Sequence, residues 1–108
     1  MLRVEASRAY FIKLGRRGQW EDDCLREGNL RIGYAKIPHG MCLHGDWEAV
    51  RELLTNEQVY PGRPGSHTAQ IQIFYEAGED TVFITFAHGC MYWCHPNGPV
   101  ALLPNGER

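Results

Sequence analysis

Two short clusters of cysteine and histidine are the residues whose types could bind a metal. Cys90 and Cys94 are separated by three residues and followed by His95, while Cys42 and His44 are separated by one. Structural zinc sites usually contain two pairs of closely spaced ligands. Cys90 and Cys94 also fall in a strand-like stretch, which would place them on one face about 13 Å apart. One ion cannot bind both thiols on an unbroken strand, so reduced, buried thiols are the favoured interpretation and no metal ligand is assigned.

The acidic and nucleophilic side chains do not form a convincing catalytic site. Asp22-Asp23 and Glu79-Asp80 are adjacent pairs, whereas catalytic carboxyl groups must converge on one substrate atom. The five histidines stand beside glycine, proline, serine or cysteine in loop-like settings. No nucleophile elbow, phosphate-binding loop, zinc-protease motif or dinucleotide fingerprint occurs. We therefore expect no enzymatic activity, no catalytic residue and no cofactor in this chain.

Aromatic residues close to basic ones point to the stacking of nucleobases instead. Most rings of so small a chain must be core, but an aromatic beside lysine or arginine is also what base-binding sites use. Lys13 interrupts an apolar strand pattern just before Gly-Arg-Arg-Gly. Alternation along that strand would put Lys13 on the face of Phe11, opposite Ile12 and Leu14. An edge-strand lysine that discourages aggregation is the structural alternative.

Length and composition set the outer limits of the interpretation. The chain has 108 residues, of which 44% are hydrophobic and 22% charged, as in one small globular domain. No apolar run approaches the ~20 residues of a membrane span, so no membrane partner is expected. Arg3, Glu5 and Arg8 interrupt any secretory signal, and a cytoplasmic location follows by default. The oligomeric state is left open.

The charge distribution is more informative than the formal net charge of -2. Residues 1–36 carry eight basic and five acidic residues, whereas residues 37–108 carry three basic and eight acidic ones. The total argues against binding nucleic acid by charge alone, but the asymmetry allows a basic patch on an acidic body.

Periodicity and turn residues predict an α+β order of elements that ends in a hairpin. Asp46 is a predicted helix cap. Ser66 would cap a helix whose inward-facing residues are Ala69, Ile73, Phe74 and Ala77. The alternation of residues 70–73 also fits a strand there. The predicted strands are 9–14, 30–34, 81–86, 90–94 and a weak 100–103; the predicted helices are 20–27, 47–54 and 66–77.

Several short motifs, in this order, resemble EVE-like domains of the PUA-like superfamily, which is related to YTH domains. They are Tyr10-Phe11-Ile12-Lys13-Leu14-Gly15, Trp20 at a helix start, Leu30-Arg31-Ile32-Gly33-Tyr34, Ile73-Phe74-Tyr75 and Gly78-Glu79-Asp80-Thr81-Val82. His88-Gly89-Cys90-Met91-Tyr92-Trp93 would be the hairpin return. The resemblance spans residues 8–96. Glu79-Asp80 departs from the usual Gly-Asp, and the stretch from His39 to His44 is an unusual loop.

The resemblance implies a small, curved, barrel-like mixed sheet of about five strands with two to three helices around it. It implies a pocket for a modified, flipped or unpaired base of DNA or RNA, as in bacterial restriction or RNA-modification-reading proteins. Lys13 and Gly15 would lie at the pocket floor or rim, Trp20 and Tyr34 would line it, and Trp93 would form a further wall. The phosphates would bind Arg16, Arg17 and Arg63.

The same resemblance sets the expected boundaries. Residues 8–104 would form a single domain, residues 1–7 an N-terminal extension, and residues 105–108 a tail at which a longer protein is truncated. The longer protein could carry a nuclease or another catalytic domain. Two alternatives stay open: a metal-stabilised, enzyme-associated module that uses the cysteine and histidine clusters, and a protein-interaction domain.

Overall fold

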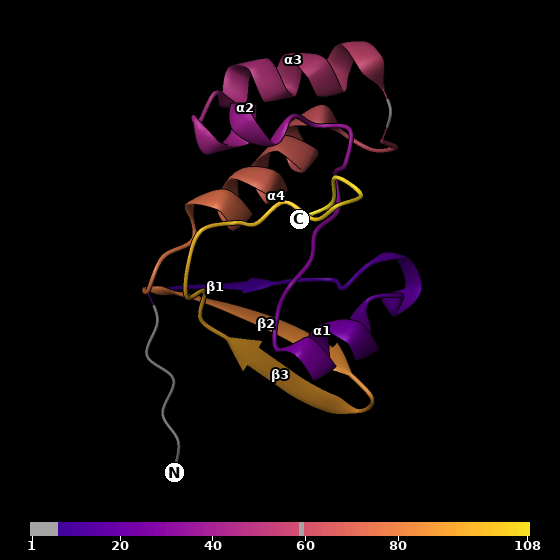
Figure 1. Cartoon of the computed structure of the whole chain (residues 1–108), viewed down its shortest axis with the longest axis vertical. Helices are drawn as coiled ribbons and strands as arrows, with labels where there is room; N and C mark the ends of the chain where they lie inside the picture. The colour runs from indigo at the N-terminus through magenta and orange to yellow at the C-terminus, as the bar shows by residue number, and fades with distance from the viewer. Residues whose placement is uncertain (1–6, 59) are drawn as a thin grey trace. The chain divides into compact units, whose positions relative to one another are not determined.

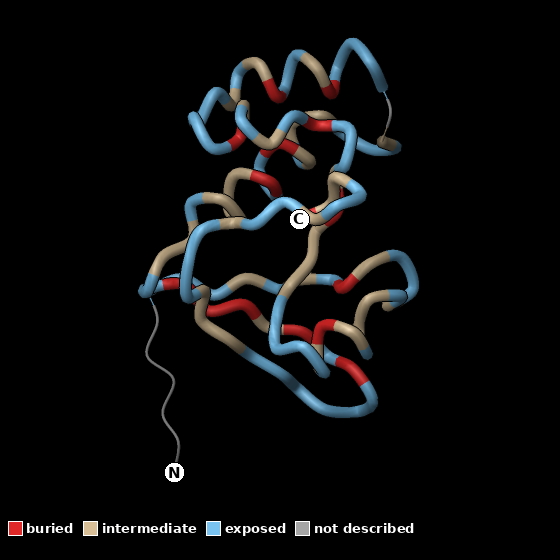
Figure 2. The backbone as a smooth tube through the Cα atoms, in the orientation of Figure 1, coloured by how far each residue is buried: buried red, intermediate tan, exposed pale blue. Residues whose placement is uncertain are grey.

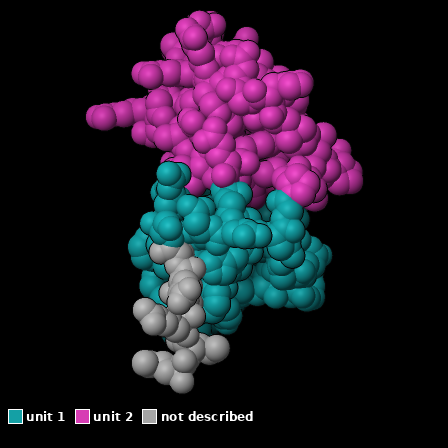
Figure 3. Space-filling model, turned by 90° about the vertical axis from the view of Figure 1, so that its left-hand side faces the viewer, with its two compact units in different colours: residues 1–32, 77–98 teal, residues 33–76, 99–108 magenta. Residues whose placement is uncertain are grey.

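Two compact units, each built from separate stretches of the chain, make up the computed structural model (Figure 3). Unit 1 contains residues 1–32 and 77–98, and unit 2 contains residues 33–76 and 99–108. The structure describes residues 7–58 and 60–108. Most of the predicted N-terminal extension therefore lies outside the described residues, and the single domain over residues 8–104 stays a prediction.

Unit 1 is organised around a three-stranded sheet in the order β1-β2-β3 (Figure 1). Strand β1 (Arg8–Phe11) runs parallel to β2 (Thr81–Ala87), and β3 (Cys90–Cys94) is antiparallel to β2. The predicted hairpin is confirmed. Its two loop residues, His88 and Gly89, have φ values of 53° and 74°. Positive φ at both positions matches the right-handed twist of the flanking strands.

The sheet corrects the predicted fold class. It is an open sheet of three strands, not a barrel-like sheet of about five. Residues 30–34 do not form a strand because Gly33 and Tyr34 take φ values of +79° and +59°, which extended backbone does not allow. Residues 100–103 lie between Pro99 and Pro104, and Leu103 enters a turn in which its amide donates to the Glu107 carbonyl.

A short helical segment covers one face of the sheet in unit 1. A 3-10 turn, η1 (Arg16–Gly18), leads into α1 (Glu21–Glu27), so the predicted helix is confirmed. Helix α1 ends where predicted because Gly28 adopts a left-handed conformation with φ of 70°, and its amide donates to the Cys24 carbonyl. The amide of Asn29 donates to the same carbonyl and turns the chain back toward the sheet.

Unit 2 consists of three helices joined by short loops: α2 (His39–Leu43), α3 (Trp47–Glu57) and α4 (Pro64–Glu76). Helix α3 begins where predicted, with the Asp46 carboxylate accepting from the Ala49 amide at 3.3 Å. Helix α2 was not expected. The buried core of unit 2 is Ile37, Cys42, Val50, Leu54 and Ile71.

Helix α4 is present, but its predicted inward face is wrong. It starts at Pro64 rather than at Ser66 and buries Thr68 and Ile71, while Ala69 is exposed. Thr68 is tolerated inside because its hydroxyl donates to the Pro64 carbonyl one turn earlier. Because of that bond, the polar Thr68 can be buried at a position where a hydrophobicity pattern predicts a solvent-facing residue.

Burial in unit 1 concentrates on the central strand (Figure 2). Thr81, Val82, Phe83, Thr85 and Ala87 are all buried, whereas every residue of β3 before Cys94 is exposed. The described helices include none that is long and apolar enough to cross a membrane.

Replacing Asp46 by alanine tests the cap of α3. The Ala49 amide loses its acceptor, so we expect Asp46→Ala to lower the free energy of unfolding by about 1 kcal/mol. Urea denaturation followed by circular dichroism measures the change. Asp46→Asn keeps a capping oxygen and serves as the control, and an equal loss in both variants would contradict the assigned cap.

Candidate functional site

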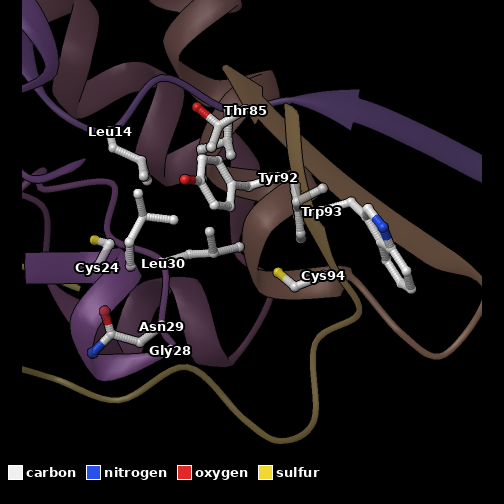
Figure 4. Close-up of a pocket in the computed structure, with 12 residues that line it drawn as sticks. Leu14, Cys24, Gly28, Asn29, Leu30, Thr85, Tyr92, Trp93 and Cys94 are labelled. Carbon is white, nitrogen blue, oxygen red and sulfur yellow. The ribbon is translucent and has the colours of Figure 1, made fainter. Parts of the chain in front are cut away.

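The face of the sheet nearest α1 contains a pocket of about 160 Å³ within unit 1 (Figure 4). Alternate residues of the strands line it: Phe83 and Thr85 from β2, and Tyr92 and Cys94 from β3. Ile12 and Leu14 continue this face beyond β1, and their neighbour Lys13 is exposed. The predicted alternation is therefore observed over residues 12–14, because Ile12 and Leu14 line the pocket while Lys13 between them does not.

Helix α1 and the chain that leaves it supply the opposite wall. Cys24 lies on the buried side of the helix, and the left-handed turn at Gly28 brings Asn29 and Leu30 to the pocket. The Tyr92 ring lies close to the side chains of Leu14 and Leu30 in Figure 4. The backbone turn at the end of α1 thus determines which side chains close the pocket.

None of the described residues that line this pocket carries a charged side chain. Burial raises the pKa of the Cys24 thiol and that of the Cys94 thiol, so both stay protonated at neutral pH. Thr85 is only 8% exposed, and its hydroxyl makes no hydrogen bond to any residue in 7–58 or 60–108. A pocket-lining hydroxyl of this kind can donate a hydrogen bond to a ligand atom or accept one from it.

The other face of the sheet is apolar and exposed. Its residues alternate with those of the pocket, and the exposed fractions are 75% for Phe11, 60% for Phe86, 57% for Met91 and 43% for Trp93. The rings of Phe11 and Phe86 are stacked, with centroids 5.6 Å apart and an interplanar angle of 27°. We call these four residues the aromatic face.

Basic residues are concentrated in the sequence around Phe11. Residues 7–18 contain Arg8, Lys13, Arg16 and Arg17 and no acidic residue. All four are exposed, and η1 holds the two last ones in the turn that follows β1. The acidic residues of α1 begin only at Glu21. The segment therefore has one exposed basic residue before Phe11 and three after it.

The residues predicted to form a base pocket are distributed over the two units. Lys13, Gly15 and Trp20 belong to unit 1 but do not line its pocket, and Tyr34 belongs to unit 2. Trp93 borders the pocket, although its indole points away from it in Figure 4.

Gly15 and Trp20 have local roles in unit 1. Gly15 has φ of +83°, and a Cβ there would come within 2.5 Å of the Gln19 side chain, so glycine is needed for the turn itself. The Arg31 guanidinium lies 5.5 Å from the centre of the Trp20 ring. That cation–π contact occupies one face of the indole.

Tyr34 is part of a hydrogen-bonded cluster in unit 2. Its hydroxyl lies 2.8 Å from His67 Nδ1 and donates to Gln70 Oε1 at 3.2 Å. The edge of its ring meets Tyr60, with centroids 5.1 Å apart. Burial raises the pKa of Tyr34 to about 12. Arg63, the third predicted phosphate ligand, is exposed just before α4.

The predicted tail contains a structural residue. Arg108 is 4% exposed, and its guanidinium donates to the Tyr75 hydroxyl at 2.7 Å and to the carbonyls of Tyr34 and Ile37. His39 accepts from or donates to the same Tyr75 hydroxyl at 2.7 Å. Residues 105–108 therefore include a contact that joins three segments of unit 2.

The cysteine and histidine clusters are dispersed in the structure. Cys90 is exposed, Cys94 lines the pocket, and His95 Nδ1 is 2.8 Å from the Thr81 carbonyl. Cys42 is buried in the core of unit 2, whereas His44 is exposed. Within the part of the chain that the structure describes, no group of three or more metal-ligating side chains converges. The metal-stabilised alternative finds no site there.

Sequence reasoning missed Phe86, Met91 and Thr85. The signal was present, because β2 and β3 alternate two sets of side chains and both sets contain large apolar residues. A sheet strand that is apolar on both faces has either a second covering layer or an exposed face.

Comparisons of the chain with protein-family models, curated proteins and solved structures found no match.

The raised pKa of Tyr34 gives a pH dependence of unit 2. Its phenol ionises near pH 10 in an unfolded chain and at about 12 in the folded one, so the folded state holds this proton more tightly. The stabilisation is complete below pH 10 and is lost as the pH rises toward 12. We expect the free energy of unfolding to fall over this range, less steeply in Tyr34→Phe. Urea denaturation at each pH measures it, and identical slopes in both proteins would contradict the assignment.

Proposed function

We propose that this chain binds single-stranded nucleic acid, with bases stacked on the aromatic face of unit 1. The observation that carries the proposal is the stacked and exposed pair Phe11 and Phe86. Each base stacked on an aromatic side chain contributes about 1–3 kcal/mol, and every base has the ring face that such stacking needs. Trp93, on the same face of β3, offers a second position.

The charges on unit 1 favour a nucleic acid over another apolar partner. Arg8 precedes Phe11, and Lys13, Arg16 and Arg17 follow it, with no carboxylate among residues 7–18. A strand whose bases stack on the sheet needs cations for its phosphates, which these residues of the same unit can supply. The apolar surface and the basic segment together fit a ligand that is aromatic and anionic at once.

The proposal keeps the ligand class expected from the sequence and changes the binding surface. Binding takes place on an open face, where an unpaired or flipped base can stack without entering an enclosed pocket. Recognition of a modified base belongs to the same proposal, because methylation enlarges the stacking surface. The chain acts as a binding module of the cytoplasm, for which its four free cysteines are suited.

Removing the stacking surface tests the proposal. We expect Phe86→Ser and Phe11→Ser each to weaken binding of a labelled single-stranded oligonucleotide about tenfold, the lower end of one stacked base. Fluorescence anisotropy at low salt measures the affinity for DNA and RNA strands, with and without methylated bases. Leu43→Ser is the matched control, because Leu43 is 55% exposed but lies in unit 2.

Two results would overturn the stacking proposal. One is that the wild type and the variants Phe86→Ser, Phe11→Ser and Leu43→Ser all bind the oligonucleotide with the same affinity, or that the wild type does not bind it at all. The other is concentration-dependent dimerisation of the wild type that Phe86→Ser abolishes, without nucleic-acid binding. The aromatic face would then be an interface between two copies of the chain.

Lys13 provides a separate electrostatic test. We expect Lys13→Met to weaken binding of every sequence alike and to reduce the slope of log affinity against log salt by about one. Its unfolding free energy should change by less than about 1 kcal/mol, because the side chain is exposed. Lys36→Met, an exposed lysine of unit 2, is the control. An unchanged salt slope in Lys13→Met would exclude a phosphate contact.

A further inference from the structure

We propose that the pocket between α1 and the sheet binds a small uncharged aromatic molecule with one ring and one hydroxyl group. This site lies on the opposite face of the sheet from the aromatic face, and the inference is independent of nucleic-acid binding. It rests on the size of the pocket, the uncharged described residues that line it and one threonine hydroxyl among them. Each of these features restricts the ligand in a different way.

The size of the pocket selects one ring. Its volume is about 160 Å³, and an apolar cavity of about 150 Å³ takes up benzene. Leu14 and Phe83 are buried at the base, while Gly28 and Asn29 at the rim are exposed. The ligand can therefore enter from solvent beside the end of α1 without unfolding the unit.

The lining excludes an ionised ligand. Among residues 7–58 and 60–108, no lysine, arginine, aspartate, glutamate or histidine borders the pocket, and the Cys24 and Cys94 thiols are held in the neutral form. A charged group would lose its hydration without gaining a counter-ion. An uncharged ring instead meets the apolar side chains of Ile12, Leu14 and Leu30.

The Thr85 hydroxyl supplies a reason for one polar atom on the ligand. Thr85 is 8% exposed and lines the pocket, and its hydroxyl makes no hydrogen bond to another side chain or to the backbone within the two described ranges of the chain. It is not sealed off inside the protein, so a ligand in the pocket can reach it. A threonine hydroxyl can both donate and accept, so a phenolic hydroxyl satisfies it in either direction. A plain hydrocarbon ring leaves it unpaired.

The test compares p-cresol with toluene, which differ only by the hydroxyl. Two-dimensional NMR of the full chain follows amide shifts as each probe is added. We expect saturable shifts around α1 and β3, with p-cresol binding about fivefold more tightly than toluene, the scale of one net hydrogen bond. Thr85→Val should bring the two affinities together. Benzoate should not bind.

Two variants place the binding on one face of the sheet. Leu30→Trp fills the pocket and should abolish the shifts, whereas Phe86→Ser alters only the aromatic face and should bind p-cresol as the wild type does. Unchanged binding by Leu30→Trp, loss of binding in Phe86→Ser, or no saturable shift in the wild type would overturn the proposal.

A chemical readout avoids substitutions inside the pocket. In Cys90→Ser the exposed thiol is absent, and Cys94 is the more accessible of the remaining thiols because Cys24 and Cys42 are each 2% exposed. Saturating p-cresol should slow the alkylation of Cys94 by iodoacetamide severalfold, measured by mass spectrometry of the peptide. An unchanged rate would place the probe outside the pocket and overturn the proposal.

Discussion

The alternation of side chains across three paired strands determines the chemistry of unit 1. Tyr10, Phe83 and Cys94 lie in register on one face, while Phe11, Ile84 and Trp93 lie in register on the other. A shift of any strand by one residue would exchange these faces. The parallel pairing of β1 with β2 therefore sets both the apolar lining of the pocket and the exposed rings on the reverse side.

The two faces of the sheet differ in the charged residues near them, and this difference selects different classes of ligand. One face is covered by α1, and the described side chains that line its pocket are uncharged, which suits a neutral molecule. The other face is open to solvent, and the exposed residues Lys13, Arg16 and Arg17 come shortly after its Phe11 in the sequence. The same short segment serves both faces, because Ile12 and Leu14 point to the pocket while Lys13 between them is exposed.

Local signals predicted the elements whose ends are fixed by nearby atoms. Asp46 caps α3, Gly28 ends α1, and His88-Gly89 closes the hairpin, each through contacts within a few residues. The order of the strands depends on contacts between residues far apart in sequence. Local patterns therefore predict neither the parallel pairing of β1 with β2 nor a sheet of only three strands within the described residues. Tyr34 was misplaced for the same reason: its partners His67 and Gln70 come from α4, and no local pattern identifies them.

The pairing of Arg8 with Thr81 has a consequence for how the chain is made. The described helices α1, α2, α3 and α4 all lie between these partners in the sequence, so the ribosome synthesises four helices before β1 can pair with β2. Contacts that close so long a loop form late in folding. The chain must lose the conformational entropy of closing the loop before the strand pairing can stabilise it. Until then β1 is a nascent strand with an unpaired edge and an exposed phenylalanine, the kind of segment that chaperones shield during synthesis.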